Sequence, residues 1–400
     1  MPQPSLKVLA IHVANGFSSE ARVITSLLAT LDPNYEITVA VHDWVVDRPV
    51  AQAFRAATAR EAISMDFGWR PSPGRHRSWR EKVVPALRFS RSALELIVHA
   101  ALLRPDVVIS NQQKWDLTLS SSLATVLQRP LVVHLHYNVG PWLGRSALRQ
   151  LRQADLVITV SDFISAQVLE MGVDSERVMT IRNSAVPAPA ARAEDRLAAR
   201  QELHVSRGAL VVGMVARIDP YKGHADVLRA FHSLPQELRS HLALVFVGAG
   251  EIREEMEHLA EELGLGGCVN FLGFRPDVRA LLAGFDVFIH PSVNDPCPLA
   301  VLEAAASGLP VIAYRSGGIP EIVEEGATAL LAEVGDLDGL TEHLRTLLTD
   351  AHLRALFGER AVERVVTRFD PVDAGAMFEA ALRRAAGDGL TRPDRRATVR

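Results

Sequence analysis

The sequence predicts an α/β protein of two domains, each a parallel sheet covered by helices, which face each other across a cleft. Short runs rich in Val and Ile alternate with longer amphipathic stretches along the chain. Such alternation predicts right-handed crossovers and parallel sheets. A Pro/Ala-rich stretch at 184–193 interrupts the alternation, and 400 residues suffice for two domains.

The composition narrows the class of protein. Hydrophobic residues make up 48% and charged residues 22%, as expected of a packed globular chain. A net charge of −4 provides no overall basic field for nucleic acid, so no nucleic-acid partner is expected. Cys268 and Cys297 are the only cysteines, which excludes a disulfide scaffold and a cysteine zinc site. No leader or membrane-spanning run is recognised, so a cytoplasmic location is expected.

The first domain is predicted to span 1–185. Its strands are expected where short β-branched runs end in turn or capping residues, at 6–13, 36–41, 106–110, 131–136 and 155–160. Helical spacing of apolar residues predicts helices at 18–30, 80–103, 116–127 and 162–171. Ser161 is placed to cap the last of them.

The second domain is predicted to span 186–370. Its strands are expected at 210–216, 242–248, 269–272, 286–290, 310–314 and 328–331. Helices are expected at 222–234, 252–263, 298–307 and 337–348. A C-terminal helix at 371–386 is expected to pack back toward the first domain, and 387–400 to form a disordered tail.

Two cations follow the first strand of the second domain. In open parallel sheets, ligands bind beyond the carboxyl ends of the strands. Arg217 and Lys222 lie in such a loop, where a planar guanidinium and a mobile ammonium suit a diphosphate. The alternative is that both are surface cations, one of them paired with Asp219.

Gly317 and Gly318 follow the strand predicted at 310–314, and Pro320 fits the first turn of a helix. Glycines let backbone approach a ligand closely, and free N–H groups at a helix start attract anions. The turn is therefore a candidate phosphate site. The alternative is a tight strand-to-helix turn with no ligand.

Asp295 and Glu303 are candidate ligands of sugar hydroxyls. Asp295 lies in the loop after the strand at 286–290, and Glu303 lies in the helix that follows. A carboxylate accepts paired hydrogen bonds from vicinal hydroxyls, as in ribose recognition. The alternative makes Asp295 a loop cap and Glu303 a solvated helix charge, although Glu303 has apolar neighbours.

In the first domain, alternation along the strand at 131–136 places His134 and His136 on one face. Only His136 lies at the carboxyl end, so it is the candidate active-site residue, with a buried core histidine as the alternative. Asn111 and Gln112, just after the strand at 106–110, are candidates for acceptor contacts.

The segment 69–91 is the most basic part of the chain. Its cations are interspersed with aromatic side chains and opposed by few acids: Arg70, Arg75, Arg77, Arg80, Lys82, Arg88 and Arg91. A basic stretch with aromatic neighbours that leads into a helix can lie on anionic lipid headgroups. The segment therefore predicts peripheral contact with an anionic membrane, with a solvated loop as the alternative.

Taken in order, these motifs resemble the donor-binding half of the family-four GT-B glycosyltransferases, a large retaining family. Arg217 and Lys222 match its arginine–lysine loop, and Gly317-Gly318 its phosphate turn. Asp295 and Glu303 match its two acidic residues separated by seven others. The resemblance covers most of 205–370 and extends more loosely over the first domain.

The resemblance implies two Rossmann-like domains and a nucleotide-diphosphate-sugar donor, with no metal cofactor. Arg217 and Lys222 would neutralise the leaving diphosphate, and the amide of Leu299 would donate to phosphate. Glu303 would hold the donor ribose, and Asp295 would lie near the sugar hydroxyls.

The resemblance also assigns residues around the donor's other end. Phe274 and Arg275 close a segment whose backbone would border the nucleotide base. Gly16 matches the glycine loop that faces the donor phosphates, and His136 matches the active-site histidine. The chain departs from the family pattern where Asp295 replaces a glutamate, and where Pro296 and Pro298 stand in place of the usual glycines.

The predicted function is that of a retaining, hexosyltransferase-like glycosyltransferase. It would move a sugar to an acceptor hydroxyl in cell-surface polysaccharide, glycolipid or glycoside biosynthesis. The alternatives are a nucleotide-sugar epimerase on the same scaffold and a non-catalytic nucleotide-sugar-binding protein. A dinucleotide oxidoreductase is disfavoured, because Gly16 lacks the rest of a G-x-G-x-x-G run.

Overall fold

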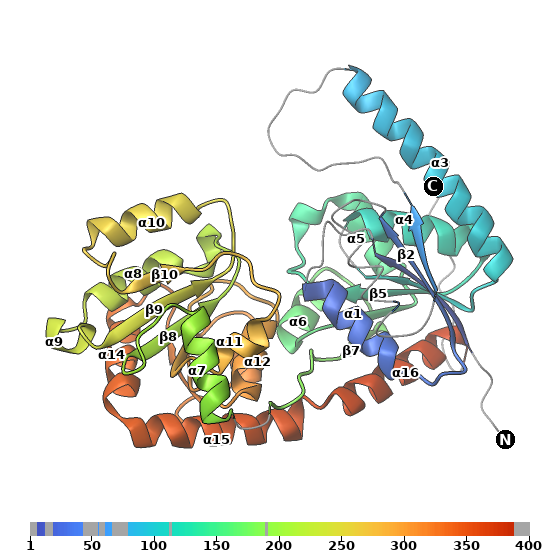
Figure 1. Ribbon diagram of the computed structural model, residues 1–400. Coiled ribbons are helices and arrows are strands. Elements are labelled where there is room, and N and C mark those ends of the chain that lie inside the picture. The colour runs from blue at the N-terminus through green and yellow to red at the C-terminus, as the bar shows by residue number, and fades with distance from the viewer. Residues whose placement is uncertain are drawn as a thin grey trace. The chain divides into compact units, whose positions relative to one another are not determined.

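The computed structural model describes residues 6–12, 19–42, 55, 61–65, 79–111, 114–188 and 191–387. The chain divides into two compact units (Figure 1). One comprises Met1–Arg182 with Pro371–Arg400, and the other comprises Asn183–Asp370. The first segment of the first unit thus ends at Arg182, whereas the sequence predicted a boundary at residue 185.

The described part of the first unit contains a seven-stranded sheet in the order β3-β2-β1-β4-β5-β6-β7. All its neighbouring strands pair in parallel. The strands are β1 (Lys7–His12), β2 (Glu36–His42), β3 (Glu61–Met65), β4 (Val107–Ser110), β5 (Leu131–Leu135), β6 (Leu156–Thr159) and β7 (Val178–Thr180). The edge strands β3 and β7 were not predicted, and the half-buried β7 lacks a buried apolar run.

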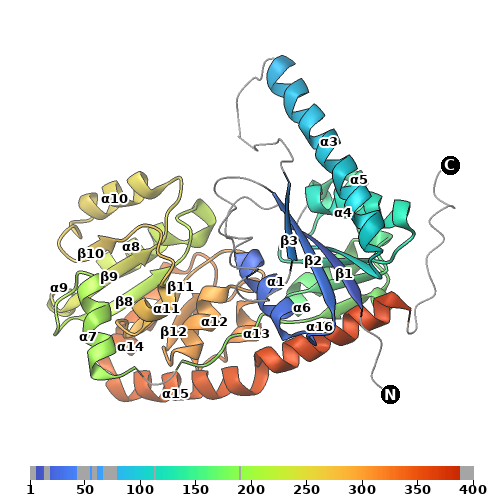
Figure 2. The ribbon, with the colours of Figure 1, turned by 45° about the vertical axis from the view of Figure 1, so that its right-hand side comes forward.

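Helices cover this sheet, and one of them comes from the C-terminal part of the chain. They are α1 (Ser19–Thr30), α3 (Trp79–Leu103), α4 (Lys114–Leu127), α5 (Arg145–Arg152), α6 (Asp162–Glu170) and α16 (Pro371–Ala386), with short 3-10 turns η1 (Pro141–Leu143) and η2 (Ser175–Arg177). α16 packs beside α1 (Figure 2), with Gly375 against Thr30. Tyr35 Oη also donates to Glu379 Oε1 of α16 at 2.8 Å, so this helix belongs to the first unit.

The second unit contains a six-stranded parallel sheet in the order β10-β9-β8-β11-β12-β13. Its strands are β8 (Leu210–Val215), β9 (Leu242–Val247), β10 (Val269–Phe271), β11 (Val287–His290), β12 (Val311–Tyr314) and β13 (Ala329–Ala332). Its helices are α7 (Ala193–Glu202), α8 (His224–His232), α9 (Gln236–Arg239), α10 (Arg253–Glu262), α11 (Val278–Leu282), α12 (Leu299–Ala306), α13 (Ile319–Ile322), α14 (Leu337–Thr349) and α15 (Ala351–Arg368).

One helix start differs from its prediction. The sequence predicted that Lys222 opens a helix, but residues Pro220–Lys222 form the 3-10 turn η3, and α8 begins at His224. Gly223 between them has φ 82°, a left-handed conformation that interrupts the helical path.

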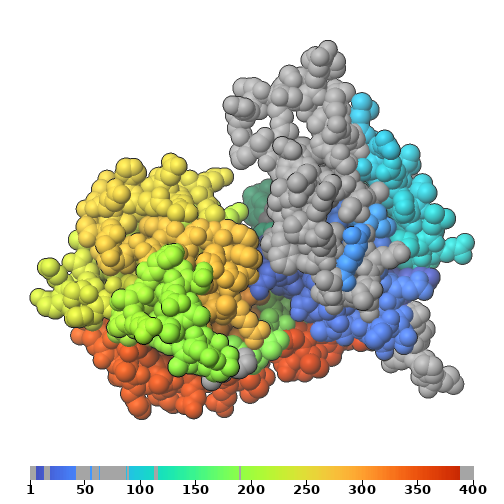
Figure 3. All heavy atoms as spheres, in the orientation of Figure 1, coloured from blue at the N-terminus to red at the C-terminus, as the bar shows by residue number. Residues whose placement is uncertain are grey.

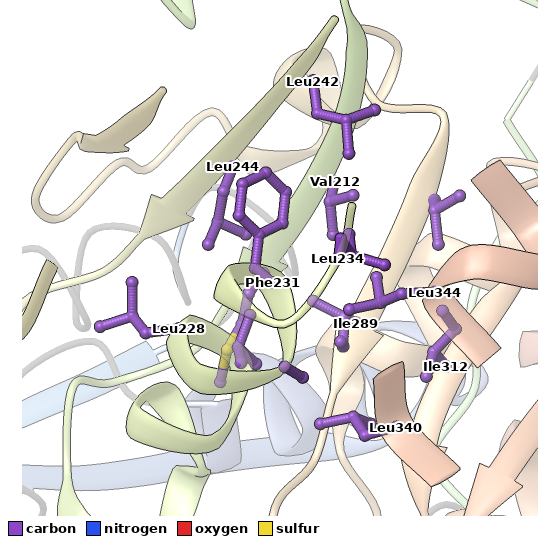
Figure 4. Close-up of a cluster of buried hydrophobic side chains, with 14 of the residues drawn as sticks. Val212, Leu228, Phe231, Leu234, Leu242, Leu244, Ile289, Ile312, Leu340 and Leu344 are labelled. Atoms are coloured by element: carbon purple, nitrogen blue, oxygen red, sulfur yellow. The ribbon is translucent and has the colours of Figure 1, made fainter. Parts of the chain in front are cut away.

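The core of the second unit lies between its sheet and helices α8 and α14. Phe231 of α8 and Leu344 of α14 pack with side chains of β8, β9, β11 and β12 (Figure 4). Full burial of each such side chain contributes about 1.5–3 kcal/mol. This core fixes the strands whose carboxyl ends carry the candidate site.

Aspartates that precede three strands tie neighbouring strands together at their amino ends. Each carboxylate accepts a hydrogen bond from a backbone N–H in the first or second residue of the adjacent strand: Asp106 from Lys7 (2.9 Å), Asp155 from Leu131 (2.7 Å) and Asp286 from Val211 (2.7 Å). These aspartates therefore stabilise the pairing of neighbouring strands. They lie at the edge of each sheet opposite the predicted ligand sites.

In each sheet the strand order reverses beside the unit's first strand, between β1 and β4 in one and between β8 and β11 in the other. Ligands of such sheets bind outside the carboxyl ends of the strands at this reversal. None of the helices in the described ranges is long and apolar enough to cross a bilayer.

Candidate functional site

Three loops meet at the carboxyl end of the second sheet. The Lys222 ammonium forms an ion pair with the Asp295 carboxylate. The N–H of Gly318 donates to the carbonyl of Asp295 at 2.9 Å, and the N–H of Val293 donates to the carbonyl of Tyr221 at 2.9 Å. The structure thus brings together the cationic loop, the acidic loop and the glycine turn that the sequence singled out.

Two glycines make these close approaches sterically possible. Gly317 has φ 56°, and a Cβ there would lie under 3.0 Å from the backbone of Asp295. Gly223 has φ 82°, and a Cβ there would lie under 3.0 Å from the carbonyl oxygen of Pro291. Any side chain at either position would push two of the three loops apart.

Asp295 is a buried carboxylate that stays ionised. Only 8% of the residue is exposed. Burial would raise the pKa of Asp295, but a hydrogen bond from His290 and the charge of Lys222 together hold that pKa well below its usual range. Lys222 is therefore held by a permanent negative charge at the junction of the loops.

His290 is the residue of this cluster whose role the sequence analysis missed. It ends β11, and its Nε2 lies 3.1 Å from Asp295 Oδ2. Burial lowers the pKa of His290, against the opposing influence of Asp295. The available signal was a histidine at the carboxyl end of a strand, five positions before an acidic loop residue.

Arg217 is held within its own loop. Its guanidinium pairs with Asp219 and with the hydroxyl of Tyr221, and that hydroxyl donates to Asp219 Oδ2 at 3.0 Å. The alternative that one cation pairs with Asp219 is therefore observed. The Arg217 side chain is still 67% exposed, so the paired guanidinium can reach a ligand.

Leu299 and Glu303 both belong to α12, the helix that follows the Asp295 loop. Leu299 is its first residue, after Pro298, and so presents its amide at the helix start. Glu303 lies on the next turn and is half-buried. The N-terminus of α12, with its partial positive charge, is thus continuous with the acidic loop.

Phe274 and Arg275 lie on a different segment of the same unit. Phe274 is exposed, and Arg275 pairs with Asp277 at 2.7 Å and with Glu202 at 3.1 Å. These contacts tie Arg275 to α7 and to the start of α11. The preceding Gly273 accepts from the N–H of Gly248 at 2.8 Å, which fixes this segment to the end of β9.

In the first unit, buried polar side chains gather at the reversal of the sheet. His12 ends β1, Asn111 follows β4 and His136 follows β5. The Asn111 amide lies 3.0 Å from His12 Nδ1 and 3.2 Å from His136 Nε2. The His134 ring lies 4.1 Å from that of His136. Asn111, predicted to contact the acceptor, is fully buried and contacts two histidines instead.

Both bridged histidines are neutral at pH 7. Burial lowers the pKa of His12 to about 4, against the opposing charge of Glu20, and lowers the pKa of His136 to about 3. His136 is 9% exposed, against 2% for His12 and none for Asn111, so it is the least buried member of this group.

Several predicted residues lie outside the described ranges. They are Gly16, Gln112, Arg70, Arg75 and Arg77, together with most of the tail predicted to be disordered. Within the ranges that are described, no group of three or more His, Cys, Asp or Glu side chains is placed to hold a metal ion.

Two family models match the chain. One, described as Glycosyltransferase Family 4, matches residues 21–186, and the other, Glycosyl transferases group 1, matches residues 195–364. The chain is 32% identical over 170 residues to the lipopolysaccharide core biosynthesis glycosyltransferase LpsE of Rhizobium meliloti, covering 42% of this chain and 48% of LpsE. It is 28% identical to N-acetyl-alpha-D-glucosaminyl L-malate synthase of Bacillus anthracis, covering 64% and 75% of the two chains.

Solved structures share the arrangement of both sheets. Anabaena Alr3699/HepE in complex with UDP and glucose superposes with a TM-score of 0.79 at 23% identity, covering 94% of this chain and 99% of that one. The two sheets have the strand order of Rossmann-like domains. The family matches, the ordered motifs and the shared fold together show that the chain belongs to the family-four glycosyltransferases of the GT-B class.

Proposed function

We propose that the chain moves a sugar, with retention of configuration, from a nucleotide-diphosphate sugar to an acceptor hydroxyl and without a metal ion. The observation that carries the proposal is the junction of the Lys222, Asp295 and Gly317 loops at the reversal of the second sheet. HepE, which has a similar fold, is solved in complex with UDP and with UDP-glucose, which supports a nucleotide-sugar donor for this chain.

The main chemical task is to stabilise the diphosphate as it leaves. Lys222 and Arg217 would supply positive charge, and the amide of Leu299 at the start of α12 would donate a hydrogen bond. These groups are held before the donor binds, so little reorganisation accompanies the reaction. Such a set of charges and amides performs the task that a Mg²⁺ ion performs elsewhere, which supports metal-independent transfer.

Each of the two units would bind one of the two substrates. The second would hold the donor, with Glu303 on the ribose, Asp295 near the sugar hydroxyls, and the segment ending in Phe274 and Arg275 beside the base. The first would hold the acceptor, with His136 at the reacting sugar. Retention of the sugar's configuration is inferred from the family. The product would be a polysaccharide, glycolipid or glycoside.

Removal of Lys222 tests the donor site. We expect Lys222→Ala to cost about 2–4 kcal/mol of transition-state stabilisation, a loss of about 30- to 1,000-fold in kcat/KM. A thermal-shift panel of UDP-, GDP- and ADP-sugars first identifies the donor, because a ligand of the folded state raises Tm. Lys7→Ala, which removes an exposed ion pair with Glu36 in the other unit, is the matched control. Near-normal turnover by Lys222→Ala would refute the assignment.

The same donor separates the alternatives. An epimerase would convert the sugar nucleotide with no acceptor present, and chromatography of the nucleotide sugar would show the isomer. A binding protein would raise Tm with the donor yet give no product with any acceptor. A transferase releases the nucleoside diphosphate in proportion to glycosylated acceptor.

We also propose that the first unit docks on the anionic, cytoplasmic face of a membrane through α3. Opposite its buried residues Ser92, Leu96 and Ala100, this helix exposes a stripe of apolar side chains: Leu87, Leu94, Val98 and Leu102. The helix extends beyond the body of its unit in Figure 1, and its atoms reach the surface in Figure 3. Arg91, also exposed, lies in the stripe and pairs with Glu95 at 2.8 Å. The basic segment 69–91 leads into the stripe, which favours anionic lipid as the partner.

Vesicle flotation tests the membrane contact. We expect the full chain to bind vesicles that contain anionic lipid at low salt, and Leu94→Glu with Leu102→Glu to abolish binding. Val126→Glu, at an exposed apolar position of α4, should leave it unchanged. No flotation by the unmodified chain would exclude the proposal. A dimer in solution that the α3 variants dissociate would instead assign this stripe to a second copy.

A further inference from the structure

The buried amide of Asn111 connects two histidines at the reversal of the first sheet. Asn111 has no exposed surface, and its neighbours His12 and His136 are 2% and 9% exposed. One end of the amide lies 3.0 Å from His12 Nδ1, and the other lies 3.2 Å from His136 Nε2. Because the Asn111 side chain is enclosed in the protein, its amide acts through its hydrogen bonds with these two histidine rings.

The backbone of α1 determines which end of the amide faces which ring. Asn111 Nδ2 lies 3.4 Å from the carbonyl oxygen of Glu20, on the side of His12. A carbonyl oxygen only accepts hydrogen bonds, so the amide nitrogen must be on that side. Asn111 Oδ1 therefore faces His136, and an oxygen acceptor requires that His136 Nε2 carry the proton.

We infer that Asn111 is a positioning residue that holds His136 in its Nε2–H tautomer and leaves His136 Nδ1 as a hydrogen-bond acceptor. The same amide donates to His12 Nδ1, which places the proton of His12 on Nε2. An acceptor nitrogen on His136 can bind a sugar hydroxyl, a role that rests on the proposed function.

Burial already determines the charge of the histidines in this network, so the open question is which ring nitrogen carries the proton. His12 and His136 are neutral at pH 7, and burial also lowers the pKa of His134, whose ring is tilted by 54° to that of His136. Glu20, on α1, is the acidic group that faces His12. A neutral imidazole has one N–H and one lone pair, so fixing one nitrogen fixes the other.

Only an amide can serve both rings in this way. It offers a donor to His12 and the Glu20 carbonyl, and an acceptor to His136. A carboxylate at the same position would accept from both histidines, which forces His12 to protonate Nδ1 while His136 stays as it is. An isosteric apolar side chain would free both rings.

Nitrogen-15 NMR of histidine-labelled full-length protein at pH 7 tests the inference, because ring shifts distinguish N–H from bare nitrogen. We expect His136 to show a protonated Nε2 and a bare Nδ1. Asn111→Asp should leave His136 unchanged and move the His12 proton to Nδ1. Asn111→Leu should give His136 shifts averaged between tautomers. The chain has 14 histidines, so His12→Gln and His136→Gln spectra assign the signals.

Asn183→Asp is the matched control. Asn183 is likewise buried and donates its amide N–H to a backbone carbonyl, that of Cys297, at 2.9 Å. Asn183→Asp places a carboxylate next to that carbonyl oxygen, at a position that does not contact His12 or His136. Both histidine tautomers should be unchanged. A shift as large as that of Asn111→Asp would mean that the effect is general destabilisation.

Activity gives an independent readout. We expect Asn111→Leu to lower kcat by about 10-fold or more with little change in donor Tm shift, because the donor phosphates bind to the other unit. A proton on Nδ1 of His136 in the unmodified protein, or an unchanged His136 signal in Asn111→Leu, overturns the inference. The spectra are taken without substrate, so the tautomer they show does not depend on whether the proposed glycosyl transfer occurs.

Discussion

At the residue scale, Gly317 determines whether its turn, after β12, can reach the Asp295 loop. It combines a positive φ of 56° with backbone of Asp295 in the place of a side chain. Gly318, next in the chain, makes the hydrogen bond between the two loops. The position therefore has both a conformational and a steric requirement for glycine.

We expect Gly317→Ala to lower the free energy of unfolding by about 1–3 kcal/mol, through strain, and to abolish the donor-dependent rise in Tm. Urea unfolding and thermal shift measure the two effects. Gly326→Ala is the control, because Gly326 has φ 72° but open space around its Cβ. If both variants lose the same stability and both still respond to donor, the contact with Asp295 is not what requires glycine at 317.

Residue types in order along the chain predicted Lys222, Asp295 and the Gly317 turn, because strand ends of a parallel sheet converge. They did not predict that Asp295 would pair with Lys222 and His290, or that Asn111 would be buried. Those contacts depend on the directions of side chains from strands that are far apart in sequence. A strand-end position predicts proximity, and it does not predict which groups neutralise one another.

At the element scale, the aspartates before β4, β6 and β11 hold the starts of adjacent strands. Asp286 accepts a hydrogen bond from the N–H of Val211. Its carboxylate also forms ion pairs with Arg196 at 2.5 Å and with Arg200 at 2.8 Å. The Arg200 side chain is only 8% exposed. Removal of the carboxylate would leave a buried guanidinium without its ion pair.

We expect Asp286→Ala to lower the free energy of unfolding by about 3–5 kcal/mol, because it leaves a buried charge uncompensated. The urea midpoint of the second unit is the measurement. Glu342→Ala, which removes an exposed pair with Arg345 on α14, should change it little. A midpoint for Asp286→Ala that matches this control would mean that Arg200 is solvated.

Central strands were predictable because they are buried on both faces and read as continuous apolar runs. The edge strands β3 and β7 were missed, and β7 is half-buried at all three positions, so it gives no continuous buried apolar run. Helix α15 was also missed, although its N-cap signal is present in Asp350, whose side chain accepts from the N–H of Leu353 at 2.8 Å. Propensity and capping signals are therefore weaker guides than burial at the ends of these domains.

At the scale of the whole molecule, both sheets use the same strand order, and each places histidines near its reversal. His12 and His136 lie in the first unit, and His224 in the second. Burial lowers their pKa values to about 4, about 3 and about 3 respectively. The usual value in an unfolded chain is about 6.5.

The sign of the resulting pH dependence follows from proton counting. Between pH 6.5 and about 4, the unfolded chain binds protons at these histidines that the folded chain does not bind. The free energy of unfolding therefore falls as pH falls through this window, by about 1.4 kcal/mol per pH unit for each histidine. Asp295, with its lowered pKa, contributes in the same direction only below about pH 4.

Urea midpoints at pH 7, 6 and 5 should therefore decrease for transitions of both units. His224→Gln should reduce the pH dependence of the second unit, to which buried His290 also contributes, and leave that of the first, since His224 packs beside Phe246 in the second core. Midpoints that stay constant from pH 7 to pH 5 would mean that these rings reach water in the folded protein. The buried histidine network from which the role of Asn111 is inferred would then be absent in solution.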